Sequence, residues 1–121
     1  MFQNDYFMLM IDNLSRAIAK VFFQKTSSSI ELFNEQGSIS ADGFLYHQLK
    51  ALMNEGQINE AENILFEEIE TNVTAETLHV AIQFYQDLQA LSDEALLESD
   101  FSRQEIIEGL EQVEKLVSIN Q

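Results

Sequence analysis

Glu76 and His79 are the pair of residues best suited by type and spacing to do chemistry. A carboxylate and an imidazole three residues apart share one face of a helix, and di-iron bundles use this Glu-x-x-His pair twice, together with two further glutamates. Here the pair occurs once, because no glutamate stands three residues before His47. We therefore interpret His79 as a half-exposed histidine beside an acidic residue. A small metal- or carboxylate-dependent enzyme using Glu76 and His79 is the alternative.

Other catalytic patterns are missing from the sequence. Cysteine is absent, which excludes disulfides, thiolate metal sites and cysteine nucleophiles. There is no phosphate-binding loop, dinucleotide-binding glycine pattern or nucleophile elbow. The glutamates at 67–70 and 105–111 fall opposite apolar stripes, as is typical of solvated helix faces. We expect no catalytic residue, cofactor or metal, and hence no enzyme.

The charge is unevenly distributed along the chain. The net charge is −15, yet residues 1–25 hold three basic and two acidic groups, for +1, while the remainder carries −16. Such a body repels nucleic acid and anionic membranes, so we expect no nucleic-acid partner. Asp12, Arg16 and Lys20 interrupt the first apolar segment, which argues against a membrane span. A peripheral membrane adaptor that uses this segment is a further alternative to the enzyme. The lack of cysteine fits a location in the cytoplasm.

The elements that would position these residues are helices. The chain has 121 residues, no proline and only four glycines, and it predicts one all-α domain of five or six helices. Its expected parts are a long N-terminal helix (1–25), a linker (26–40) and a helical body (41–121). In the body we expect helices at 41–55 and 60–71, one after the cap Thr74, a short one at 92–99, and one after the capping box Ser102–Glu105.

Apolar residues at three-and-four spacing mark the inner side of each helix of the body. Gly109 interrupts the last helix at a cost of about 1 kcal/mol, which predicts a close helix contact there. The expected inner residues are Leu45, Leu49 and Leu52; Ala61, Ile64, Leu65 and Ile69; Leu78, Ala81, Ile82, Tyr85 and Leu88; Ile106, Leu110, Val113 and Val117.

Residues 56–61 predict a tight corner between two helices. Gly56 can take the positive φ that ends a helix. Asn59 is expected to cap the next helix, with Glu62 as its capping-box partner. Ala61 is small enough to let the two helices approach closely. Gly56, Asn59 and Ala61 are therefore the expected structural corner.

The first helix carries more apolar surface than one packing face requires. This excess predicts a docking surface for a partner or a second copy, and its expected contact residues are Phe7, Met10, Ile11, Leu14, Ile18 and Phe22. The alternative is that residues 26–40 fold back over the helix. We expect a non-catalytic protein-interaction module whose partner the sequence does not name, with a homodimer through this helix as one arrangement.

Two resemblances support this interpretation. Leu45, Leu49, Leu52, Ala61 and Leu65 occupy pattern positions of a single tetratricopeptide repeat. Four blocks of the sequence, in order, resemble an uncharacterised bacterial family, a domain of unknown function. These blocks are Asn4-Asp5-Tyr6 to Ile18-Ala19-Lys20, residues 56–63, Phe84-Tyr85-x-x-Leu88, and Phe101-Ser102-Arg103-Gln104-Glu105-Ile106 to Glu108-Gly109-Leu110. The resemblance implies a tetratricopeptide-like fold in Gram-positive bacteria and supplies no activity or catalytic residue.

Overall fold

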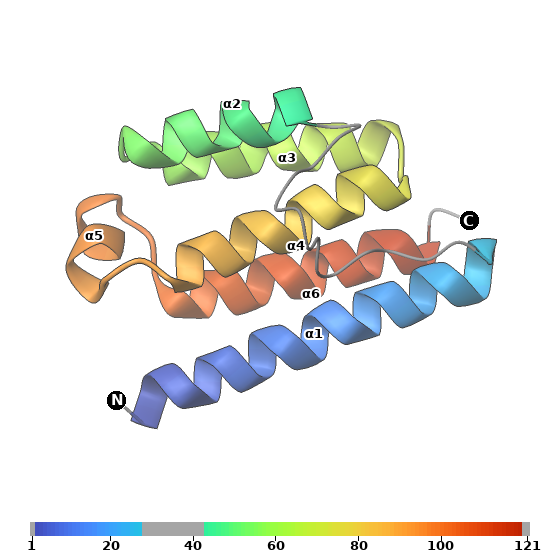
Figure 1. Ribbon diagram of the computed structural model, residues 1–121, viewed down its shortest axis with the longest axis horizontal. Coiled ribbons are helices and arrows are strands. Elements are labelled where there is room, and N and C mark those ends of the chain that lie inside the picture. The colour runs from blue at the N-terminus through green and yellow to red at the C-terminus, as the bar shows by residue number, and fades with distance from the viewer. Residues whose placement is uncertain (1, 28–42, 120–121) are drawn as a thin grey trace.

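The computed structural model describes residues 2–27 and 43–119, and within these ranges the secondary structure consists of α-helices without a strand. This confirms the predicted all-α class. Six helices occupy the described part of the chain (Figure 1): α1 (Phe2–Thr26), α2 (Gly43–Asn54), α3 (Ile58–Thr71), α4 (Ala75–Gln89), α5 (Asp93–Glu98) and α6 (Arg103–Ile119).

The helices are stacked with α4 at the centre. Figure 1 shows α2 and α3 as an antiparallel pair on one side, α4 and α6 in the middle, and α1 along the other side of α6. Helix α4 packs against α1, α2, α3 and α6, and every residue from Thr77 to Ile82 is buried. A helix buried on all sides is typical of the core of a bundle. Buried side chains from all six helices form one hydrophobic cluster.

The ends of α1 and α2 lie close to the predicted positions. Helix α1 starts at Phe2 and ends at Thr26, where the next residue, Ser27, has a φ of 62° and donates a hydrogen bond from its N–H to the Phe23 carbonyl. Helix α2 extends over Gly43–Asn54 in the described part of the chain and ends one residue before the expected end. The predicted linker, apart from Thr26 and Ser27, and the first two residues of the helix expected at 41–55 lie outside the described residues.

The corner between α2 and α3 is only partly as predicted. Gly56 has a φ of +78° and Ala61 is fully buried, as expected. The prediction that Asn59 caps α3 was wrong, because α3 begins two residues earlier, at Ile58, and its N-cap residue Gln57 makes no side-chain capping bond. Burial of Ile58 fixes this earlier start. The Asn59 amide instead donates to the carbonyl of Asp100, at 3.4 Å.

The other predicted caps are present. Thr74 and Thr77 form a reciprocal capping box at the start of α4. At the start of α6, the Ser102 N–H donates to the Glu105 carboxylate (2.8 Å) and the Glu105 N–H donates to the Ser102 hydroxyl (3.2 Å). These bonds satisfy N–H groups that the first turn of a helix leaves without partners.

The predicted inner stripes are buried with two exceptions. Leu52 and Ile64 are only partly buried, whereas Met53 and Ile58, which the stripes omitted, are buried. Gly109 makes the predicted close contact, since a β-carbon at this position would lie 2.2 Å from the Tyr85 hydroxyl oxygen. The missing side chain is therefore what lets α6 approach α4 at Tyr85.

Arg103 joins the end of α4 to α5 and α6. Its guanidinium group donates to the carbonyls of Gln89 and Leu91, to the Gln89 side chain and to the Asp93 carboxylate, at 2.8–3.0 Å. A guanidinium group has five donors in a rigid fork, so it can hold several acceptors at once. This cluster fixes the connection from the end of α4 through α5 to the start of α6 (Figure 1).

Candidate interaction site

Glu76 and His79, the residues of the alternative enzyme hypothesis, differ in exposure. Glu76 is exposed, whereas His79 is buried, so the expectation of a half-exposed histidine was wrong. Helix α4 is surrounded by other helices, which is why its histidine is not at the surface. The described residues contain no group of three or more side chains that could hold a metal ion.

The six predicted contact residues of α1 face the bundle more than the solvent. Ile11, Ile18 and Phe22 are buried in the core cluster, and Phe7, Met10 and Leu14 are partly buried against it. Helix α1 packs mainly on α6, with a smaller contact to α4. The most apolar stripe of α1 therefore packs against other helices of the same chain.

The opposite side of α1 carries large exposed apolar side chains that are not among the predicted contact residues. Tyr6, Leu9 and Phe23 are 58%, 60% and 53% exposed, and Met8 is exposed at the side of the helix. We call the line of exposed residues along this side the outer strip. It consists of Tyr6, Leu9, Asn13, Arg16, Lys20 and Phe23. Their spacing of alternating three and four residues was a signal available in the sequence.

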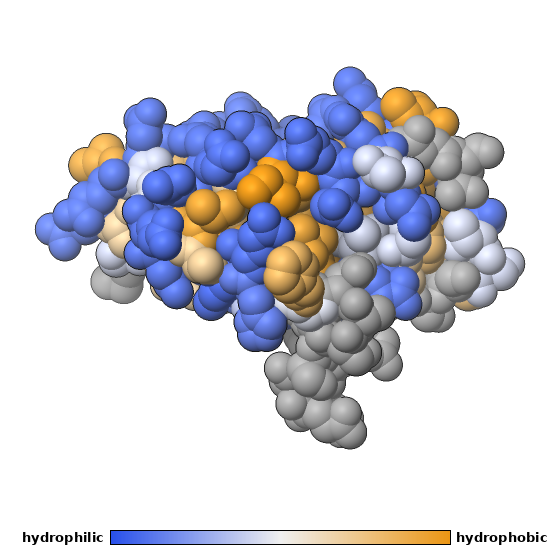
Figure 2. Space-filling model, turned by 90° about the horizontal axis from the view of Figure 1, so that it is seen from above, coloured by the Kyte–Doolittle hydropathy of each residue, from blue (hydrophilic) through white to orange (hydrophobic). Residues whose placement is uncertain are grey.

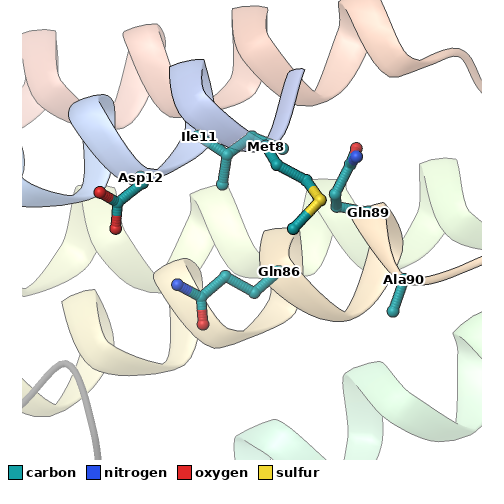
Figure 3. A pocket seen from close by; sticks show the side chains of 6 residues that line it. All are labelled: Met8, Ile11, Asp12, Gln86, Gln89 and Ala90. Atoms are coloured by element: carbon teal, nitrogen blue, oxygen red, sulfur yellow. The ribbon is translucent and has the colours of Figure 1, made fainter. Parts of the chain in front are cut away.

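An open groove lies beside this strip, between α1 and the end of α4. Its volume is about 360 Å³, and its lining residues are Met8, Ile11, Asp12, Gln86, Gln89 and Ala90. Figure 3 shows Met8 and Ile11 extending from α1 toward the end of α4, where Gln86 and Gln89 lie. Asp12 forms an ion pair with Arg16 at 3.0 Å. The groove therefore presents apolar and neutral amide groups, which suits an apolar side chain of a protein partner better than an ion.

A second, smaller groove of about 220 Å³ is acidic and lies between α3 and α6. Here the Tyr85 hydroxyl donates to the Glu62 carboxylate at 2.6 Å. Burial raises the pKa of the Glu62 carboxyl above its ordinary value, the carboxylates of Glu105 and Glu108 raise it further, and the bond from Tyr85 opposes them. Burial, followed by the charge of Glu62, also raises the pKa of Tyr85. This groove has no basic or metal-binding partner among its lining residues.

A polar cluster holds α2 to α4. Asp87 accepts hydrogen bonds from the Tyr46 hydroxyl (2.5 Å) and the Gln83 amide (2.9 Å), and Lys50 Nζ lies 3.1 Å from it. Burial raises the pKa of Tyr46, and Asp87 raises it further. Each member has a partner within the chain, so the cluster is structural.

The face over α2 and α3 differs from the outer strip. Figure 2 shows the molecule from above, and on this face hydrophilic residues surround small hydrophobic patches. Phe44 of α2 is an isolated exposed aromatic residue in the described part of that helix. Scattered exposed apolar residues are ordinary on a protein surface. None of the helices in the described ranges combines the length and apolar character needed to cross a membrane.

The chain shows no match to a curated protein or to a solved structure. A family model, described as a family of unknown function (DUF6483), matches residues 1–118. The match covers all six helices apart from Ile119, the last residue of α6, and it includes the outer strip and both grooves. The chain therefore belongs to this family of unknown function, DUF6483.

Proposed function

We propose that the protein is a non-catalytic protein-interaction module that binds its partner through the outer strip of α1. The observation that carries this proposal is that α1 bears large apolar side chains on two opposite sides. Its inner side is occupied by α6 and α4, while Tyr6, Leu9 and Phe23 remain more than half exposed on the other side. Aromatic residues are enriched where proteins meet, so this strip is the best candidate surface.

The electrostatics support the same surface. The body beyond residue 25 carries a net charge of −16, whereas residues 1–25 carry +1. A protein partner can therefore approach α1 without the repulsion that the acidic faces of α3 and α6 present to an acidic protein. The adjacent groove with Met8 at its edge extends the apolar area available to such a partner.

The finer features of the proposal rest on the sequence. We place the protein in the cytoplasm of a Gram-positive bacterium, following the resemblance noted above and the absence of cysteine. We also propose that the α2–α3 hairpin is a single tetratricopeptide-like pair, supported by Ala61 at the crossing and Gly56 at the turn. Helical repeats of this type usually bind other proteins.

Site-specific photo-crosslinking inside living cells tests the proposed function. A photoreactive phenylalanine analogue at Leu9 should give a discrete adduct of defined mass. The matched control places the analogue at Leu97, which is 78% exposed on α5 and is also an exposed leucine. The adduct should be absent at position 97 and should be lost when Tyr6, one turn away, is replaced with Ser. Equal labelling at both positions, or no adduct at position 9, would contradict the proposal.

A further inference from the structure

The spacing of the outer strip is that of a coiled-coil seam. From Tyr6 onward its members follow one another at intervals of 3, 4, 3, 4 and 3 residues, and every one of them is exposed. An apolar or mixed stripe with this alternation runs along one side of a helix and pairs with a similar stripe on another helix. Here the two ends of the stripe are apolar and its centre is polar, with Asn13, Arg16 and Lys20.

The charges of α1 are divided between its two halves. Asp5 and Asp12 lie in the first half, and Arg16, Lys20 and Lys25 lie in the second. Two copies of α1 in parallel orientation would place like charges beside each other. Two copies in antiparallel orientation would place the acidic half of each beside the basic half of the other, which is favourable. The helix is thus complementary to itself in one orientation.

Resting on the proposed function, we infer that the partner is a second copy of this chain, whose α1 packs antiparallel on the outer strip. A single two-fold axis between residues 14 and 15 pairs the whole strip. It places Tyr6 opposite the partner's Phe23, Leu9 opposite the partner's Lys20, and Asn13 opposite the partner's Arg16. All three pairs share the same midpoint, so one register satisfies them together.

The chemistry of each pair fits its place. The aromatic rings of Tyr6 and the partner's Phe23 close both ends of the seam. The aliphatic stem of the partner's Lys20 covers Leu9 while its ammonium group reaches solvent near Asp12. A central Asn paired with Arg fixes register, as polar residues inside coiled-coil seams do. A seam of this size buries on the order of 1,000 Å², the lower end for a specific interface, so we expect a dimer in the micromolar range.

Light scattering and sedimentation of the full chain at tens of micromolar give the first measurement. The protein should have twice the mass of the monomer, and Leu9→Glu should halve it. Leu97→Glu is the matched control and should leave the mass of the dimer unchanged, because Leu97 is exposed on α5, away from the strip. Circular dichroism should show the same helix content in both variants, since both leucines are exposed.

Disulfide trapping tests the orientation of the two α1 helices, and because the chain has no native cysteine, only the introduced cysteines can form a disulfide. Under mild oxidation, a mixture of the Leu9→Cys and Lys20→Cys proteins should form a covalent dimer. Either variant alone should stay uncrosslinked, because in the antiparallel register the copies of one position lie 11 residues apart along the helix, about 16 Å, beyond the reach of a disulfide. Self-linking of Leu9→Cys in place of the mixed product would indicate parallel helices and overturn the register.

A monomer at these concentrations would overturn the second copy as partner. The photo-crosslinking result then separates the two failures. A discrete adduct with a different protein at position 9 would leave the proposed function standing without the homodimer. A monomer with no adduct at position 9 would refute both.

Discussion

Replacement of Gly109 by alanine should destabilise the protein, although the same change in an open helix is stabilising. A β-carbon at this position would lie 2.2 Å from the Tyr85 hydroxyl oxygen and 2.4 Å from its Cζ atom, so the buried ring must move. The movement would also disturb the 2.6 Å hydrogen bond from Tyr85 to Glu62.

Three contributions set the size of the change in the free energy of unfolding. Overpacking a buried contact costs about 1–3 kcal/mol, and loss of a hydrogen bond to a charged group costs about 1.5 kcal/mol at a site that is partly open to solvent. The helix propensity of alanine returns about 1 kcal/mol. We therefore expect Gly109→Ala to lower the free energy of unfolding by about 2–3 kcal/mol. At about 2.1 cal/mol/K per residue, the melting temperature should fall by about 10 °C.

Urea unfolding and thermal melting measure this effect, with two comparisons. Gly43→Ala is the matched control, since a β-carbon there would meet nothing within 4 Å, and it should be neutral or slightly stabilising. Tyr85→Phe removes the atom nearest to the new methyl group, so the cost of Gly109→Ala should be smaller in that background than in the native chain. A stabilised Gly109→Ala protein would refute the close contact between α4 and α6.

Three further predictions follow from burial, from charge and from hydrogen bonding. Ala61→Phe should lower the urea midpoint by the equivalent of about 1–3 kcal/mol or more, because Ala61 is fully buried, and an unchanged midpoint would contradict the packed corner. The folded chain raises the pKa of Glu62 above its ordinary value of 4.5, so the stability that this group contributes is present below pH 4.5 and is lost as the pH rises through the higher, folded pKa. Urea titrations at several pH values should therefore show that Glu62→Gln becomes more stable relative to the native chain over this rise in pH. Parallel pH profiles of the two proteins would contradict the prediction. Arg103→Lys should cost about 1–2 kcal/mol in thermal melts, because a single ammonium group cannot satisfy all the acceptors of the guanidinium group, and an unchanged melting temperature would show that those bonds contribute nothing.

The local features of the fold could be predicted from the sequence. The capping box at Ser102 and Glu105, the cap at Thr74 and the stripe of α6 depend on residues within a few positions of one another. Gly56 and Gly109 were also assigned correctly, because a glycine in each place has few explanations other than positive φ or a close approach.

The predictions that failed concerned residues whose surroundings are set by partners distant in the sequence. Asn59 satisfied the capping rule, but burial of Ile58 in the core outweighed it and started α3 earlier. His79 was expected at a half-exposed position because periodicity assumes one solvated face, and α4 has none over the segment from Thr77 to Ile82. For α1 the sequence indicated two apolar sides without indicating which side the bundle would cover. That choice is made by α6, which is more than 70 residues further along the chain.

The pairing of α1 with α6 has a consequence for the order of folding. The two helices are separated by the whole sequence from 27 to 102, so closing this contact carries a large loop entropy and comes late. On the ribosome, α1 emerges long before α6 is synthesised, and the apolar side chains of Ile11, Ile18 and Phe22 stay without their cover for that interval. At 5–20 residues per second the interval lasts roughly 5–20 s. A nascent chain with such a helix exposed is a substrate for chaperones that hold apolar segments.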